Sequence, residues 1–226
     1  MLARITISGY SKKEIFKEPS GLNKKGLMFV ILTYEMENNL YVNVTNKCPN
    51  ACDFCVRNVE DAFGQDLWLK KDPTSVDLIK DIFSRNLSQY KELVFCGFGE
   101  PLENLEEVLS VCNEVKQKSK IHIRINTNGL ANKIHKADVT PRFKSLVDSV
   151  SISLNAKNAE EYDALCHSIY GKDAFPAMLD FTQKCKAYVD DVQLSIVDCL
   201  PPDHIQECRK IADDLGVTLK IRKEVK

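Results

Sequence analysis

The sequence lacks a long hydrophobic run. Its longest apolar stretch, 27–34, is far too short to cross a bilayer, and no small-residue cleavage site of a signal peptide accompanies it. We therefore expect a cytoplasmic protein with no membrane partner. Fixed-period repeats and low-complexity tracts are also absent, which argues against a repeat architecture.

An excess of charge of either sign is missing too. The 31 Lys and Arg residues are balanced by 32 Asp and Glu residues. This balance argues against a broad phosphate-binding surface, although a local basic patch remains compatible with it. With 44% hydrophobic and 28% charged residues in 226, the chain has the composition and size of one soluble globular domain.

The N-terminal residues differ in charge from the rest. Residues 1–27 contain six Lys and Arg residues against two Glu residues, with scattered Gly, Pro and Ser. This pattern predicts a basic, loosely ordered extension at 1–27 and a core domain at 28–226.

Short β-branched runs alternate with helical patterns along the core domain. Six strands are predicted, at 40–45, 93–97, 121–126, 149–154, 192–197 and 217–221. Weaker or broken helical patterns lie at 144–147, 160–166, 174–188 and 203–215. This alternation predicts an α/β fold with a parallel sheet, and six units favour an open partial (βα)6 barrel over a closed eight-stranded one. Catalytic groups then belong at the carboxyl ends of the strands.

Two helices have clearer signals. Pro73 stands at a helix start, and Val76, Ile79, Ile82 and Phe83 supply the expected apolar face. The second helix is expected to begin at an N-cap residue, Asn104, with Glu107 completing a near capping box.

Three of the nine cysteines crowd into eight residues directly after the first predicted strand. Cys48, Cys52 and Cys55 have the spacing Cys-x3-Cys-x2-Cys, and the odd total of cysteines fits a secreted disulfide framework poorly. Structural zinc usually takes four ligands as two spaced pairs. An iron–sulfur cluster held by three thiolates keeps one iron open for a small molecule, so the missing fourth ligand has a purpose.

This spacing, with aromatic Phe54 before the last cysteine, resembles the signature of the radical S-adenosylmethionine (radical SAM) enzymes. The segment "CGFGEPL" at the end of the second predicted strand is similar to the family's Gly-Gly-Glu-Pro segment, which holds the methionine amino group of the cofactor. Gly97 and Gly99 allow close backbone approach or positive φ, and Glu100 supplies an acceptor for an ammonium. A plain turn before a helix is the alternative.

Two further strand ends carry polar residues. "INTNGL" contains Asn126 and Thr127, and "SISLNA" contains Ser153 and Asn155. Both segments resemble family positions that bind the cofactor's carboxylate, ribose or adenine, and the "SLNA" form is similar to members that methylate RNA adenines. Polar residues at strand ends are common in any α/β fold, so a structural role is equally compatible.

The motifs together resemble the small TatD-associated radical SAM proteins, from about residue 28 to the C-terminus. That resemblance implies an open (βα)6 partial TIM-like barrel of the radical SAM type. It also implies a [4Fe-4S] cluster on the three cysteines that cleaves S-adenosylmethionine (SAM) to a 5′-deoxyadenosyl radical, which abstracts hydrogen from a substrate. An electron donor such as flavodoxin or ferredoxin, and a functional link to a TatD-family protein, are implied as well.

The target stays open between a small-molecule or nucleotide-like substrate and a partner protein, as with activating enzymes that install a glycyl radical. A non-enzymatic metal-binding interaction module is a further alternative. Cys166, Cys185, Cys199 and Cys208 lack the tight spacing of a second cluster, Cys96 and Cys112 fit core positions, and the four histidines form no recognisable pair. The single Trp68 either packs or covers the cofactor or substrate.

Overall fold

A computed structural model describes residues 30–59 and 66–223. The predicted N-terminal extension lies outside the described residues. Seven strands form one sheet in chain order: β1 (Thr33–Met36), β2 (Asn39–Val42), β3 (Glu92–Phe95), β4 (His122–Thr127), β5 (Ser149–Ser153), β6 (Asp191–Val197) and β7 (Thr218–Arg222). β1 pairs antiparallel with β2, and every later pair is parallel. The sheet is open, with β1 and β7 at its edges.

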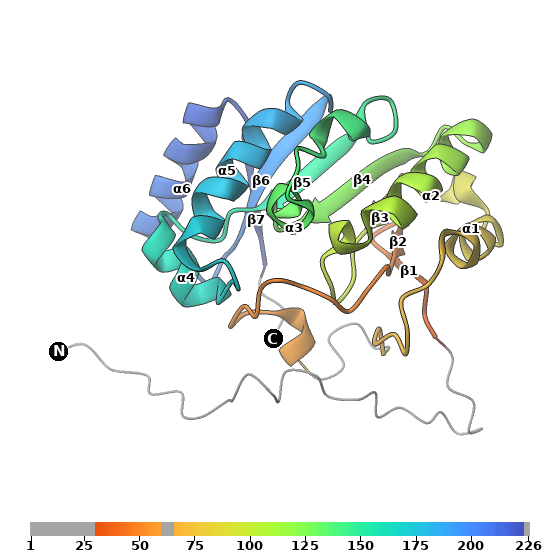
Figure 1. Cartoon of the computed structure of the whole chain (residues 1–226), viewed down its shortest axis with the longest axis horizontal. Coiled ribbons are helices and arrows are strands. Elements are labelled where there is room, and N and C mark those ends of the chain that lie inside the picture. Colours follow the sequence, from red (N-terminus) through yellow and green to blue (C-terminus); the bar gives the residue numbers. More distant parts are fainter. Residues whose placement is uncertain (1–29, 60–65, 224–226) are drawn as a thin grey trace.

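Helices connect the parallel strands and lie together on one side of the curved sheet (Figure 1). They are α1 (Ser75–Phe83), α2 (Leu105–Lys118), α3 (Ala131–His135), α4 (Ala159–Cys166), α5 (Ala174–Cys185) and α6 (Pro202–Leu215). The six strands β2–β7 correspond to the six predicted strands. The structure therefore confirms the expected α/β fold with an open, mostly parallel sheet.

The main core lies between the helices and one face of the sheet. Alternate strand residues such as Phe95, Ile125, Val150 and Leu194 are fully buried in it. Their strand neighbours point to the opposite, concave face, because successive side chains of a strand alternate between faces. This separation leaves the concave face and the carboxyl ends of β2–β7 available for chemistry.

Two elements were not predicted, and one predicted helix is wrong. β1 and α3 have no counterpart in the sequence expectations. Of the expected helix at 144–147, residues 144–146 form a turn that follows a short 3-10 helix at Thr140–Phe143. Ser145 has a φ of 63°, in the left-handed region that an α-helix cannot contain, so the helical pattern ends there.

The expected helix signals are partly replaced by tertiary contacts. Asn104 makes no side-chain cap, because its amide donates to the Val44 carbonyl at 3.3 Å, and Glu107 accepts from the Ser75 backbone N–H instead. Thr74 forms the capping box that begins α1. Val76, expected on the apolar face of that helix, is 72% exposed.

Candidate functional site

The cysteine loop leaves the carboxyl end of β2 and is fixed by contacts with α4. The Ala51 N–H donates to the Cys166 carbonyl at 2.9 Å, and the Asp53 N–H donates to the Leu165 carbonyl at 3.0 Å. Within the loop, the Cys55 N–H donates to the Cys52 carbonyl at 3.1 Å. These bonds hold the loop at the edge of the sheet where a parallel barrel places its active groups.

Arg57 forms hydrogen bonds with backbone carbonyls of the cysteine loop. Its guanidinium donates to the carbonyls of Asn46 at 3.2 Å and Asn50 at 3.4 Å. The guanidinium carbon also lies 6.0 Å from the ring centroid of Trp68, within range of a cation–π contact. These contacts hold the segment that contains Arg57 against the cysteine loop.

Cys48 and Cys52 lie in a protein environment that disfavours their thiolate forms. Burial, together with the nearby Glu100 charge, raises the pKa of the Cys48 thiol to about 12, against the opposing effect of Arg57. The pKa of Cys52 is raised by a hydrogen bond with Cys166 and by burial. Thiolates are the form that binds metals, so iron must displace protons at this loop.

The donor chemistry of the loop fits an iron–sulfur cluster. Three sulfur ligands on one loop are the set that such clusters take. Across residues 30–59 and 66–223, no three His, Cys, Asp or Glu side chains stand grouped around a metal position, so convergence of the three sulfurs stays a prediction. Two buried amide oxygens, those of Asn50 in the loop and Asn155 after β5, accept no hydrogen bond from the described residues. Such unsatisfied acceptors fit a site built for a polar ligand.

Gly97 and Gly99 bring the loop after β3 against the cysteine loop. A Cβ at Gly99 would stand 2.2 Å from the Thr45 carbonyl oxygen and 2.6 Å from that of Lys47. A Cβ at Gly97 would stand 2.3 Å from the Asn43 side-chain oxygen. Neither glycine has positive φ, so their role in this structure is close backbone packing.

Glu100 is the most heavily bonded acid of the site. Its buried carboxylate accepts from the Leu102 N–H at 3.1 Å, the Thr127 hydroxyl at 2.7 Å and the Asn128 N–H at 2.6 Å. Burial raises its pKa to about 7, against the lowering effect of these donors. A carboxylate has about four lone-pair positions, so one acceptor position remains for an ammonium.

The end of β4 meets Glu100 and the cysteine loop together. Thr127 is buried beside Glu100, and the Asn128 side-chain amide points to the Cys48 sulfur at 3.9 Å. Asn126 lies on the concave face, where its side-chain oxygen accepts from Arg124 at 3.3 Å. Thr127 and Asn126, both predicted to bind the cofactor, thus lie on opposite faces of the strand end.

The end of β5 supplies the remaining predicted residues. Ser153 is half-buried at the strand's last position, and Asn155 is buried with a φ of 55°. Between them, the Leu154 N–H donates to the Ser195 carbonyl of β6. Left-handed backbone at a non-glycine residue is uncommon and favours Asn, and such strain gathers at functional sites.

The aromatic residues near the loop are engaged in packing. Phe54 is half-buried against the main core. Trp68 makes an edge-to-face contact with Phe98, with ring centroids 5.1 Å apart. Trp68 therefore links Arg57 of the cysteine loop to the loop after β3.

The other cysteines and the histidines have structural surroundings. Cys112, Cys166, Cys185 and Cys208 are fully buried in the main core, and none of the nine cysteines forms a disulfide. Cys96 differs from its predicted core role, because it is half-buried and packs beside the cluster of Tyr34, Tyr41, Leu67 and Val94. His122, His135 and His204 contact partners outside the cysteine loop, whereas His167 is hydrogen-bonded to Asp53 within it at 2.8 Å.

Sequence reasoning missed the contacts of Arg57 and Asn128 with the cysteine loop, and it did not single out Arg124 and Arg222. Asn128 could have been found, since it directly follows a strand end that was already singled out. Arg124 and Arg222 could not, because only the register across several strands brings them to one face.

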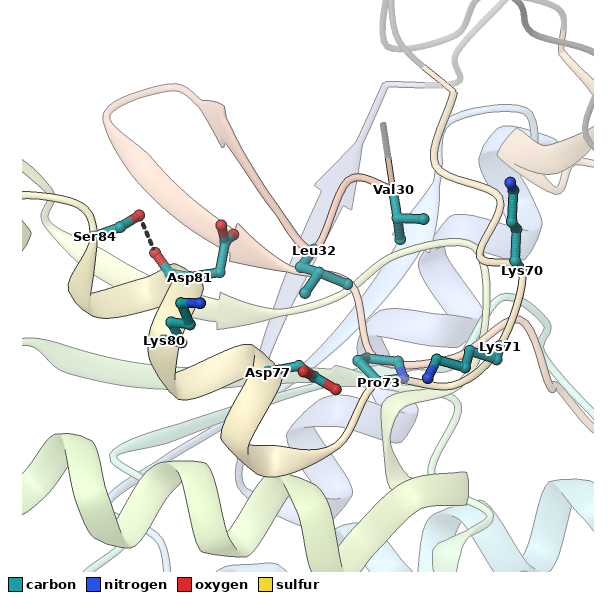
Figure 2. Close-up of a pocket in the computed structure, with 9 residues that line it drawn as sticks. All are labelled: Val30, Leu32, Lys70, Lys71, Pro73, Asp77, Lys80, Asp81 and Ser84. Atoms are coloured by element: carbon teal, nitrogen blue, oxygen red, sulfur yellow. Dashed lines mark hydrogen bonds between the residues drawn. The ribbon is translucent and has the colours of Figure 1, made fainter. Parts of the chain in front are cut away.

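A groove of about 560 Å³ lies beside α1, away from the strand ends of β3–β6 (Figure 2). Val30 and Leu32 form its apolar part, and Lys70, Lys71 and Lys80 stand around it.

None of the helices within the described residues has the length and apolar character that membrane crossing would require.

Comparison with known proteins gives a consistent family. The family model described as the radical SAM superfamily matches residues 42–215. A probable dual-specificity RNA methyltransferase RlmN from Prochlorococcus marinus is 29% identical over 192 residues, which cover 79% of this chain and 53% of that protein. The same protein from Trichodesmium erythraeum is 29% identical over 180 residues, covering 72% and 47%. The chain thus spans about half the length of these relatives.

Solved structures share the fold. A radical SAM methyltransferase from Sphaerobacter thermophilus has a TM-score of 0.58 at 14% identity, covering 84% of this chain and 68% of that one. Streptococcus suis SuiB bound to S-adenosylmethionine has a TM-score of 0.57 at 14% identity, covering 81% and 38%.

Proposed function

The chain belongs to the radical SAM superfamily, which uses a [4Fe-4S] cluster and SAM, and we propose that it cleaves SAM reductively to start a radical reaction. The observation that carries the proposal is the position of the three cysteines on a loop that both Glu100 and Asn128 contact or approach. Cys48, Cys52 and Cys55 would hold the cluster. When bound, the cluster supplies the electron that breaks SAM into methionine and a 5′-deoxyadenosyl radical.

The residues around the loop have separate tasks in this proposal. Gly97 and Gly99 keep the loop after β3 close to the cysteines, and Glu100 accepts a hydrogen bond from the cofactor's ammonium. Asn126, Thr127, Ser153 and Asn155 orient its carboxylate and ribose. Phe54 packs beneath the loop and excludes water. The protein thereby positions the cofactor, while the cofactor supplies the reactive chemistry.

The substrate is proposed to be a small molecule or nucleotide-like compound. Support comes from the curated relatives, whose names describe RNA methyltransferases. A partner protein activated by radical transfer, and a non-enzymatic metal-binding module, are the competing functions. The module predicts no SAM cleavage, and the activating enzyme predicts cleavage that is stimulated by a protein.

Several finer assignments belong to the same proposal. We place the chain among the TatD-associated radical SAM proteins, with a functional link to a TatD-family protein. Flavodoxin or ferredoxin is the proposed electron donor, and the cytoplasm the proposed location. The motifs quoted from the sequence support this subgroup.

The test is anaerobic incubation of the iron-reconstituted protein with dithionite and SAM. Formation of 5′-deoxyadenosine, detected by liquid chromatography and mass spectrometry, is the expected result. A reconstituted protein that carries iron but forms no 5′-deoxyadenosine contradicts the proposal. Deuterium transfer from candidate metabolites into 5′-deoxyadenosine then identifies the substrate.

A further inference from the structure

The concave face of the sheet carries polar and cationic side chains on β4–β7, beside the apolar cluster of Tyr34, Tyr41, Leu67 and Val94 on the side of β1–β3. Register pairs Arg124 with Ser149, Ser153 with Ser195, and Val197 with Arg222. Directly paired residues of a parallel sheet share a face, and residues two positions apart in one strand share it too. Arg124 on β4 and Arg222 on β7 therefore face the same concave space, opposite the helices.

Arg124 is a buried cation whose bonding is incomplete. Its side chain is 9% exposed and forms an ion pair with Glu92, whose Oε2 lies 2.9 Å from Nη2. A second donor, Nη1, reaches the Asn126 oxygen at 3.3 Å. The buried Nε has no hydrogen-bond partner. An unpaired buried N–H donor is unfavourable, so Arg124 keeps one donor for which the described residues supply no acceptor.

Arg222 stands at the carboxyl end of β7, on the same edge of the sheet as the cysteine loop. It is exposed, yet its pKa is lowered, chiefly by burial and also by the positive charge of Arg124. Cys52 and Cys96 act on it electrostatically as well. Its pairing with Val197 places its side chain on the concave face of the sheet. No carboxylate of the described residues pairs with this guanidinium.

The charges on this face do not cancel. Two guanidiniums, which stay protonated in proteins, influence one another, and Glu92 neutralises only the one on β4. The Cys96 thiol, which interacts electrostatically with both guanidiniums, adds no negative charge at neutral pH, since burial raises its pKa. Like charges held together in a concave site are stabilised by a bound anion.

We infer that Arg222, with Arg124 behind it, binds an oxyanion of the substrate, either a carboxylate or a phosphate. The inference rests on the proposed function and specifies its substrate class. A planar guanidinium binds both kinds of oxyanion through two parallel N–H···O bonds. Arg222 would anchor the anionic end of the substrate on β7, which leaves the remainder of the molecule to extend toward the cysteine loop.

The test measures anion binding to the reconstituted holoenzyme saturated with SAM. Inorganic phosphate and succinate are titrated separately by isothermal calorimetry into the wild type, Arg222→Gln, Arg222→Lys and Arg209→Gln. Arg209 lies on the exposed side of α6 and loses the same charge. We expect one of the two anions to bind, about ten-fold or more weaker binding by Arg222→Gln, and unchanged binding by Arg209→Gln, because hydrogen bonds to charged groups have this magnitude. Arg222→Lys should fall between them.

The phosphate and succinate titrations distinguish which kind of oxyanion the substrate carries. Preference for phosphate indicates a phosphorylated or nucleotide substrate, and preference for succinate indicates a carboxylate. Equal binding by the wild type and Arg222→Gln, or no binding of either anion, overturns the inference. A ten-fold loss of SAM affinity in Arg222→Gln overturns it as well, because the guanidinium would then hold the cofactor's carboxylate. Failure of the wild type to form 5′-deoxyadenosine in the same samples refutes the proposed function separately.

Discussion

The Thr127 hydroxyl donates a 2.7 Å hydrogen bond to the Glu100 carboxylate, and this bond joins the end of β4 to the loop after β3. The same carboxylate accepts from the backbone N–H of Asn128, whose side chain points to Cys48. One buried acid thus connects two strand ends with the first cysteine. Loss of this acid should disturb cofactor binding without removing any metal ligand.

Replacing Glu100 with Ala should weaken SAM binding about ten-fold or more and leave the iron content unchanged. The change removes a charged acceptor with three donors, and each such bond contributes about 1.5–3 kcal/mol. Equilibrium dialysis with SAM and an iron assay measure the two quantities. Glu106→Ala is the control, because its exposed pair with Arg142 lies outside the site. Unchanged SAM affinity in Glu100→Ala removes this residue from the site.

Replacing Cys52 with Ala should abolish cluster binding, whereas Cys208→Ala should retain it. Cys52 is on the loop that supplies the ligands, and Cys208 is buried in α6 within the main core. Iron and sulfide analysis and the visible absorption of the anaerobically reconstituted proteins provide the measurement. Equal iron loss in both variants would move the ligand assignment away from the loop.

Replacing Gly99 with Ala should destabilise the chain by roughly 3 kcal/mol, at the upper end of overpacking costs. The added Cβ would meet two backbone carbonyls, and backbone atoms cannot rotate away as a side chain does. Gly171→Ala is the comparison, because the nearest atom to its Cβ is 3.9 Å away and only its φ of 56° opposes the change. Urea unfolding should show the smaller loss there, about 1 kcal/mol. A Gly99→Ala variant as stable as the wild type contradicts the close packing.

The stability of the metal-free chain should fall as pH rises from about 4.5 to about 7. Glu100 has its pKa raised from 4.5 to about 7, so the folded chain binds a proton in this interval that the unfolded chain has lost. At 1.36 kcal/mol per unit, the effect reaches about 3 kcal/mol. Urea unfolding at several pH values measures it. The decline should be smaller in Glu100→Gln, and identical slopes for both chains would show that Glu100 is not its source.

The sequence predicted the parallel strands well because each is a compact β-branched run between turn signals. β1 was not predicted because the turn that joins it to β2 contains Glu37 and Asn38, both at positive φ, without the glycine that usually marks such a hairpin. The Asn104 cap failed because a tertiary acceptor, the Val44 carbonyl, took its side chain. Local patterns do not reveal such distant competitors.

Part of the site was predictable from the sequence because some of its residues lie in short local motifs. Cys48 and Glu100 stand in short motifs at strand ends, where chain position alone indicates chemistry. Arg124 and Arg222 stand 98 positions apart within ordinary strand patterns, and their shared face emerges only from the register of β4 through β7. Residues whose shared face depends on the register of several strands could therefore be identified only from the structure.

The bonds between the cysteine loop and α4 determine when the loop can become ordered during translation. The side chains of Asp53 and His167 are hydrogen-bonded at 2.8 Å although they stand 114 positions apart in sequence, and this bond lies beside the backbone bonds from Ala51 and Asp53 to α4. Contacts of such separation form late, after the intervening chain has been synthesised. The thiols therefore leave the ribosome on a segment that is not yet anchored. Iron must then be delivered after α4 has emerged and packed against the loop.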